Sequence, residues 1–247
     1  MKTTRLIVFP NLDVLNTEVA DRFAQLARQH TKTGRRFFMA ISGGETPKRL
    51  YKRLAAEPYR SRIPWRRVEI FWTDERCVPA SHPESNFGNA RRLFLSKIPI
   101  PKDNIHRMPT ELGDPLVIAE AYEQTLRKAF QRRRQAKPVF DLILAGVGAD
   151  GHVASLFPGS AAVLEKRHWV TAARRRDADV PRVTLTLPVL NCAKHLIFLV
   201  AGRKKAAMLF TAFGKKRVSR QLPVSQVQPG QGSAIWFVDR QAAQRIC

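Results

Sequence analysis

Short apolar runs alternate with amphipathic segments along the whole chain. Runs of apolar, β-branched and aromatic residues with the length of strands occupy 6–9, 36–41, 68–73, 140–145, 195–201 and 234–239. Between them, apolar residues recur at spacings of three and four, as on one face of a helix: Val19, Phe23, Leu26 and Ala27; Leu50 and Leu54; Ile118, Tyr122, Leu126 and Phe130. This alternation predicts an α/β fold with a mostly parallel sheet and helices on both faces.

The chain has 247 residues, a length that suits one large α/β domain or two small ones. No linker-like stretch or internal repeat divides it, and we interpret the Pro-rich segment 95–109 as a surface excursion. The sequence therefore predicts a single domain over residues 1–247.

Composition indicates a globular protein that does not cross a membrane. The chain is 44% hydrophobic and 26% charged, and no apolar run approaches the roughly 20 residues that a bilayer span needs. The apolar stretch near the N-terminus is too short for a signal peptide. Cys77, Cys192 and Cys247 are far apart and form no C-x-x-C pair, which disfavours a disulfide framework or a zinc ribbon. We expect a cytoplasmic protein, monomeric or weakly dimeric.

The formal net charge of +23 is the most unusual global feature. Such a field attracts anions of any kind, including nucleic acid, acidic lipid and phosphorylated metabolites. The basic runs at 60–67, 131–137, 173–176 and 214–220 lack interleaved stacking aromatics and any known DNA-binding motif. We interpret them as a solvated basic surface and expect neither a specific nucleic-acid partner nor a membrane partner.

Candidate chemistry collects where four predicted strands end. The strands 36–41, 68–73, 140–145 and 195–201 lead into "SGGETP", "DERCVP", "GVGADGH" and "GRKKA". Carboxyl ends of parallel strands lie along one edge of a sheet, and ligands bind there in open α/β folds. The four loops are therefore expected to form one site.

The loop "SGGETP" has the composition of an anion site. Gly43 and Gly44 allow a tight turn, Thr46 is expected to cap the next helix, and Pro47 fits its first turn. Free N–H groups at a helix N-terminus bind anions. An ordinary glycine-rich turn is the alternative, and neither the Walker spacing nor G-x-G-x-x-G is present.

The loop "DERCVP" places Asp74, Glu75 and Arg76 in a row. Three adjacent charged residues cannot all point inward, so at least one is expected at the surface, and a structural Asp–Arg ion pair is an alternative. We interpret Cys77 as packing rather than as a nucleophile, because sequence alone places no histidine base beside it.

His152 and Asp150 raise the sharpest question. A metal site needs further ligands, and no H-E-x-x-H spacing occurs. A structural histidine is the usual alternative, but Gly146, Gly148 and Gly151 leave room for a ligand near the backbone. Asp150 is placed to orient one imidazole nitrogen and leave the other free as a general base near neutral pH.

Five blocks in order resemble one family: "ISGGETP", "WTDERCVPASHPESNFGNARRLFL", "GVGADGHVASLFPGS", "PRVTLTLPVLN" and "AGRKKAAML". The chain is similar to 6-phosphogluconolactonases over about residues 6–240, a family grouped with glucosamine-6-phosphate deaminases. The resemblance implies a modified Rossmann-like fold and metal- and cofactor-free hydrolysis of 6-phospho-D-glucono-1,5-lactone. The deaminases carry a catalytic glutamate where this chain has Phe157, which favours the lactonase branch over the amino-sugar-phosphate isomerase/deaminase branch.

The resemblance also implies roles for single residues. His152 is expected to act as general base, Asp150 to hold its tautomer, and Arg76 to stabilise the oxyanion. Asp74 matches the proton-abstracting position of the deaminases and is expected only to bind hydroxyls. The phosphate site is expected to comprise Ser42, Gly43, Gly44, Thr46, Arg182 and Lys205, although Arg182 and Lys205 alone would read as ordinary surface cations. The chain departs from the family at Glu45, where a serine is usual.

Overall fold

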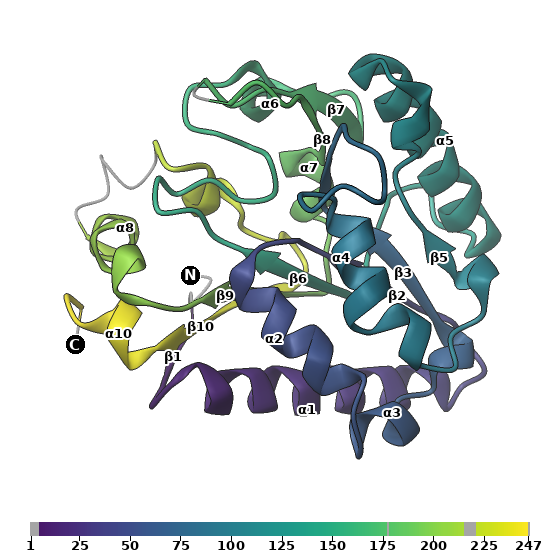
Figure 1. The fold of residues 1–247 in the computed structure, drawn as a ribbon, viewed down its shortest axis with the longest axis horizontal. Coiled ribbons are helices and arrows are strands. Elements are labelled where there is room, and N and C mark those ends of the chain that lie inside the picture. The colour runs from purple at the N-terminus through teal and green to yellow at the C-terminus, as the bar shows by residue number, and fades with distance from the viewer. Residues whose placement is uncertain (1–4, 177, 215–220, 247) are drawn as a thin grey trace.

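The computed structural model describes residues 5–176, 178–214 and 221–246, which form two sheets surrounded by helices (Figure 1). The basic run 214–220 lies, apart from Gly214, outside the described residues. The elements, with η for 3-10 helices, are β1 (Arg5–Phe9), α1 (Leu12–Thr31), β2 (Phe37–Ile41), α2 (Glu45–Leu54), α3 (Tyr59–Arg62), η1 (Trp65–Arg67), β3 (Val68–Trp72), β4 (Asp74–Arg76), α4 (Asn86–Leu93), η2 (Leu95–Lys97), η3 (Lys102–Asn104), β5 (Ile105–His106), η4 (Thr110–Leu112), α5 (Pro115–Arg132), β6 (Leu142–Gly146), α6 (Ala161–Leu164), β7 (Val170–Ala173), β8 (Arg182–Leu185), α7 (Leu187–Leu190), β9 (His195–Val200), η5 (Arg203–Lys205), α8 (Ala206–Phe213), η6 (Pro223–Gln226), β10 (Ser233–Asp239) and α10 (Arg240–Ala243).

The main sheet has seven strands in the order β1-β10-β9-β6-β2-β3-β5, and every neighbouring pair is parallel. The six predicted strands are all present in it, so the prediction of a mostly parallel α/β sheet is confirmed. Every residue of β2 and β3 is buried, although their side chains alternate between the two faces. Both faces of the sheet are therefore covered.

The helices begin where the sequence supplies capping groups. The Asn11 side chain accepts hydrogen bonds from the N–H groups of Asp13 and Val14, which starts α1. Asp114 does the same for the first turn of α5. In the described chain, no helix is both long and apolar enough to cross a membrane.

Sequence patterning missed a second, antiparallel sheet, β4-β8-β7. Its strands have three or four residues, too short for a periodic signal. After β3, the Thr73 N–H still donates to the carbonyl of Ile41, while the Thr73 carbonyl accepts from Leu185 N–H. The chain thus leaves one sheet for the other at this residue, and α5 packs on the second sheet (Figure 1).

The interpretation of 95–109 as a surface excursion is wrong in part. Leu95, Ile98 and Met108 are buried in the core, and β5 pairs with β3 at the edge of the main sheet. Proline breaks the apolar pattern here, so the short strand leaves no alternation to detect.

The order of the strands fixes where a ligand site can form. The chain runs from β2 outward through β3 to β5, then returns to β6 on the other side of β2 and continues through β9 to β10. The direction of winding therefore reverses between β2 and β6. In open α/β sheets, such a switch point opens a crevice at the carboxyl ends of the strands.

Candidate active site

The loops after β2 and β6 meet at the switch point. The Ser42 hydroxyl oxygen accepts a hydrogen bond of 2.9 Å from Gly146 N–H, and the Tyr51 hydroxyl donates to the carbonyl of Ser42. Ser42 is buried, so these bonds fix the start of the glycine turn. The predicted meeting of these two loops is thus present in the structure.

The glycine turn leads directly into α2. Gly44 has φ 105° and occupies the position before the helix, with no side chain capping it. Thr46 lies inside the first turn, so the expectation that it caps the helix is wrong; the helix begins earlier because glycine adopts this φ without strain. The first N–H groups of α2 have no partner within the helix, which leaves them available to an anion.

Glu45, the departure from the usual family pattern, does not point into the turn. Its carboxylate pairs with Lys48 Nζ at 2.5 Å, and its side chain is 87% exposed. The pair neutralises the extra negative charge on the solvent side of α2. An anion at Gly43 and Gly44 would therefore not face a free carboxylate.

His152 and Asp150 form the pair that the sequence predicts. His152 Nδ1 lies 2.6 Å from Asp150 Oδ1, and the same oxygen accepts from His152 N–H at 3.2 Å. Gly148 makes this approach possible, because a Cβ there would lie 2.1 Å from His152 Nδ1 and 2.3 Å from Asp150 Oδ1. Among the described residues, none bonds His152 Nε2, so that nitrogen is open to a ligand.

The charge of the pair is set by its surroundings. Burial alone would raise the pKa of Asp150, but the hydrogen bond and charge of His152 outweigh it and lower the pKa to about 2. Asp150 is therefore ionised at neutral pH. Burial lowers the pKa of Lys205, at the end of η5, and the charge of Asp150 opposes that shift. Lys205 thus lies within electrostatic reach of Asp150.

Arg76 and Arg182 stand opposite each other in the β4–β8 ladder. The Nε atom of each is buried and has no hydrogen-bond partner within the described chain. Burial lowers the pKa of Arg182, and the charge of Arg76 adds to that shift while Asp74 opposes it. The buried Nε–H group of each arginine is therefore open to a hydrogen-bond acceptor.

Phe157 lies between Arg182 and His152. Its ring centroid lies 4.8 Å from that of His152, and the guanidinium carbon of Arg182 lies 5.5 Å from the same ring. His152 and Arg182 therefore flank one apolar side chain, which cannot exchange protons with a ligand.

Asp74 is buried, and both of its oxygen atoms accept protein hydroxyl groups. Thr73 donates at 3.1 Å and Ser155 at 2.7 Å. Ser155 N–H also donates to the Thr184 hydroxyl. Asp74 therefore ties the His152 loop to the second sheet.

Glu75 is a site-building residue that sequence reasoning did not identify. Its carboxylate accepts from the N–H groups of Arg76, Asn86 and Phe87 at 2.7–2.8 Å, which anchors the start of α4 beside Arg76. At least one residue of this row was expected at the surface. Asp74 and Glu75 are both buried, and only Arg76 is partly exposed. The Ser85–Asn86 dipeptide, a typical helix start, was the available signal.

Two further groups bear on the chemistry. Burial raises the pKa of Cys77 to about 11, with Glu75 and Asp114 adding to the shift, so its thiol is protonated and unreactive at neutral pH.

Within residues 5–176, 178–214 and 221–246, no three His, Cys, Asp or Glu side chains come together as metal ligands.

The order of the strands defines a Rossmann-like α/β protein whose polar loops lie at the carboxyl edge of its sheet. Residues 10–236 match the family model of glucosamine-6-phosphate isomerases/6-phosphogluconolactonase, and the chain belongs to that family.

Relatives with this fold cover most of the chain. The 6-phosphogluconolactonase of Synechocystis sp. is 42% identical over 208 residues, 84% of each chain. That of Nostoc sp. is 38% identical over 211 residues, 85% of each chain. The crystal structure of 6-phosphogluconolactonase from Thermotoga maritima superposes with a TM-score of 0.81 at 30% identity, covering 96% of this chain and 100% of the other. The predicted Rossmann-like fold and family are confirmed.

Proposed function

We propose that this protein hydrolyses 6-phospho-D-glucono-1,5-lactone to 6-phospho-D-gluconate, the second step of the oxidative pentose phosphate pathway. The names of the relatives support the reaction. The observation that carries the proposal is the His152 Nδ1–Asp150 Oδ1 contact of 2.6 Å at the switch point, with Nε2 open. Such a pair activates water without a metal or cofactor.

His152 is the general base in this mechanism. Its Nε2 takes a proton from a water molecule as the water oxygen attacks the lactone carbonyl carbon. The tetrahedral intermediate then collapses, the bond to the ring oxygen breaks, and the imidazolium returns the proton to that oxygen. Asp150, ionised beside Nδ1, holds the required tautomer and stabilises the imidazolium.

Cationic side chains and backbone N–H groups stabilise the oxyanion and bind the substrate phosphate. Arg76 stabilises the negative charge that develops on the carbonyl oxygen, and its anchoring by Glu75 supports this role. The substrate phosphate sits against the N–H groups of Gly43, Gly44 and Thr46, beside the Ser42 hydroxyl. Arg182 and Lys205 supply balancing charge.

Asp74 acts as a positioning residue. A lactone has no carbon acid for it to deprotonate, and its two oxygens already accept the Thr73 and Ser155 hydroxyls. These contacts support a role in holding the His152 loop. Removing the carboxylate is therefore expected to displace His152 rather than to remove a proton acceptor.

We further infer that the chain is one domain over residues 1–247 and works in the cytoplasm as a monomer or weak dimer. A single cluster of buried apolar side chains extends under both sheets, which supports one domain.

The decisive experiment is a coupled assay with freshly generated 6-phosphogluconolactone, corrected for spontaneous hydrolysis, beside an ammonia-release assay with glucosamine 6-phosphate. Lactone turnover well above background, lost in His152→Ala, is the expected result. Ammonia release from the amino sugar would instead assign the chain to the deaminase branch despite Phe157. Inactivity on both substrates would refute an enzymatic role for this site.

A further inference from the structure

A second hollow lies at the amino edge of the main sheet, opposite the candidate active site. β2, β3 and β9 begin there, and α5 ends there. Its volume of about 660 Å³ falls within the range of ~300–1,000 Å³ that small-molecule sites occupy. Five cationic side chains line it: Arg35, Arg36, Arg132, Arg133 and Lys194.

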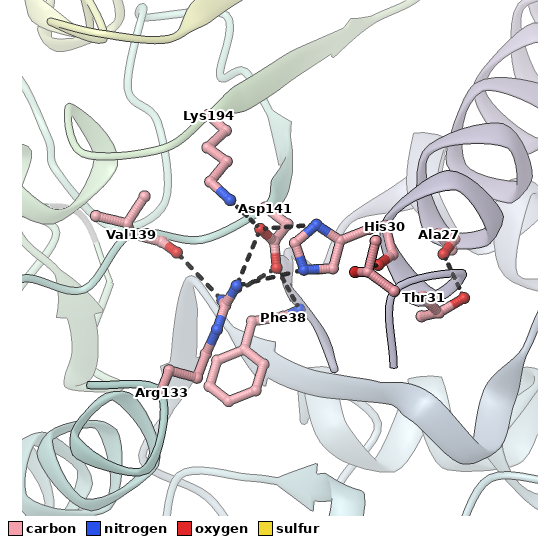
Figure 2. Close-up of polar contacts among 9 residues, drawn as sticks. Ala27, His30, Thr31, Phe38, Arg133, Val139, Asp141 and Lys194 are labelled. Carbon is pink, nitrogen blue, oxygen red and sulfur yellow. Dashed lines mark hydrogen bonds and ion pairs between the residues drawn. The ribbon is translucent and has the colours of Figure 1, made fainter. Parts of the chain in front are cut away.

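Asp141, directly before β6, fixes two of these cations. Figure 2 shows Lys194, Arg133 and His30 converging on its carboxylate. Lys194 Nζ donates to Oδ1 at 2.8 Å, and Arg133 lies 3.0 Å from Oδ2 and 3.2 Å from Oδ1. The Phe38 N–H donates to Oδ2 at 2.9 Å. The Asp141 side chain is only 2% exposed, so it holds these cations from beneath the hollow.

Glu69 fixes Arg36 in the same way. Arg36 Nη1 donates to Glu69 Oε1 and to Asn104 Oδ1, each at 2.8 Å, while His106 contacts the other Glu69 oxygen. Burial alone would raise the pKa of Glu69, but the hydrogen bond and charge of His106 and the charges of Arg36 and Arg132 outweigh it and lower the pKa. Glu69 is therefore an ionised anchor under the hollow.

The remaining cations have no such anchor. Arg35 makes no hydrogen bond or ion pair with another described residue, and Arg132 reaches Glu69 only at 4.0 Å with its side chain 66% exposed. Asp103 is the one further acidic side chain in the lining. Five cations thus face three carboxylates, Asp141 included, which leaves a net charge of about +2.

The lining also limits the kind of anion. Arginine forks bind phosphate oxygens in pairs. Phe38 is the only aromatic residue of the lining in the described chain, and the Arg133 guanidinium covers its ring at 4.5 Å, so no aromatic face is free to stack a base. We propose that this hollow binds a small anion carrying two or more phosphate groups, at a site separate from the candidate active site.

Isothermal titration with inorganic pyrophosphate tests the proposal. The background variant is Arg182→Ala/Lys205→Ala, which weakens anion binding at the candidate active site. Salt of about 150 mM screens the diffuse field of the basic surface beyond roughly 8 Å. Adding Arg35→Ala/Arg132→Ala removes the two exposed, unanchored cations, and we expect the Kd for pyrophosphate to rise roughly tenfold or more.

The matched control is Arg49→Ala/Arg91→Ala in the same background. Both arginines are exposed and lie outside the hollow. Their replacement removes the same amount of charge as the test pair, so the Kd for pyrophosphate should stay unchanged. No pyrophosphate binding in the background variant would overturn the proposal, as would equal weakening by both pairs. If a DNA duplex binds more tightly than pyrophosphate and loses affinity when Arg35 and Arg132 are replaced, the ligand of the hollow is a nucleic acid and the proposal of a small anion is wrong.

Discussion

Arg76 and Arg182 are cross-strand partners in the β4–β8 ladder, and each keeps a buried Nε without a hydrogen-bond partner in the described chain. Like charges directly opposite each other in a ladder destabilise a sheet. In the proposed function, the anionic substrate is the group that accepts from both arginines and offsets this repulsion.

The first prediction concerns phosphate binding. Arg182→Ala and Lys205→Ala are each expected to raise KM roughly 10- to 100-fold with a smaller change in kcat, because phosphate binding acts equally in the ground and transition states. Steady-state kinetics on the lactone measure both constants. Arg240→Ala, an exposed arginine on α10, is the control. An unchanged KM in both site variants would mean that the phosphate binds elsewhere.

The second prediction concerns the general base. His152→Ala is expected to lower kcat by roughly 10²–10⁴-fold, the range for a lost general base. Asp150→Asn should also lower kcat, because an amide cannot stabilise the imidazolium. KM should change little in either variant. A near-normal kcat in purified, folded His152→Ala would remove this residue from the mechanism.

The third prediction tests the fit of the glycine loop. Gly148→Ala would place a Cβ 2.1 Å from His152 Nδ1, so the histidine–aspartate pair must separate and kcat should fall about as far as in His152→Ala. Gly146→Ala is the matched control, since its Cβ would meet Ser42 Oγ at an ordinary 3.6 Å. An equal fall in kcat in both variants would show that the loop tolerates no added side chain at either position. The contact between His152 and Asp150 would then not depend on Gly148 in particular.

Much of this architecture follows from the sequence because its elements are long and periodic. The parallel strands are continuous apolar runs, and the convergence of their loops follows from sheet geometry alone. The second sheet was missed because Asp74–Arg76 is a polar three-residue strand whose acids are buried. Short strands of this kind are specified by tertiary partners and not by their own pattern.

In the candidate site, the sequence predicts contacts between near neighbours but not contacts between distant residues. The Asp150–His152 pair is local, so two residues of spacing reveal it. The capping of α4 by Glu75 joins residues eleven or twelve positions apart, and the anchoring of Lys194 by Asp141 spans 53 positions. Such pairings depend on the completed fold, and the sequence around Ser85–Asn86 indicates at most the start of α4, not its partner Glu75.

The fourth prediction concerns that capping carboxylate. Glu75→Ala leaves the N–H groups of Arg76, Asn86 and Phe87 without their acceptor. Unpaired buried donors cost about 1–3 kcal/mol each, some of which water recovers, so the free energy of unfolding should fall by about 3 kcal/mol. Urea denaturation measures it. Glu84→Ala, an exposed acid on the same segment, should change stability by less than about 0.5 kcal/mol.

The last prediction follows from the lowered pKa of Asp150, which is about 2 in the folded protein against 3.8 ordinarily. Because the unfolded chain binds a proton more readily, the ionised carboxylate stabilises the folded state. This contribution is fully present above pH about 4 and is lost as the pH falls toward 2. The stability difference between the wild type and Asp150→Asn, measured by urea denaturation, should therefore stay constant above pH about 4 and shrink steadily as the pH falls from about 4 toward 2. Asp179→Asn, at an exposed position, should show no such trend. A difference independent of pH would mean that His152 does not hold Asp150 in its ionised form.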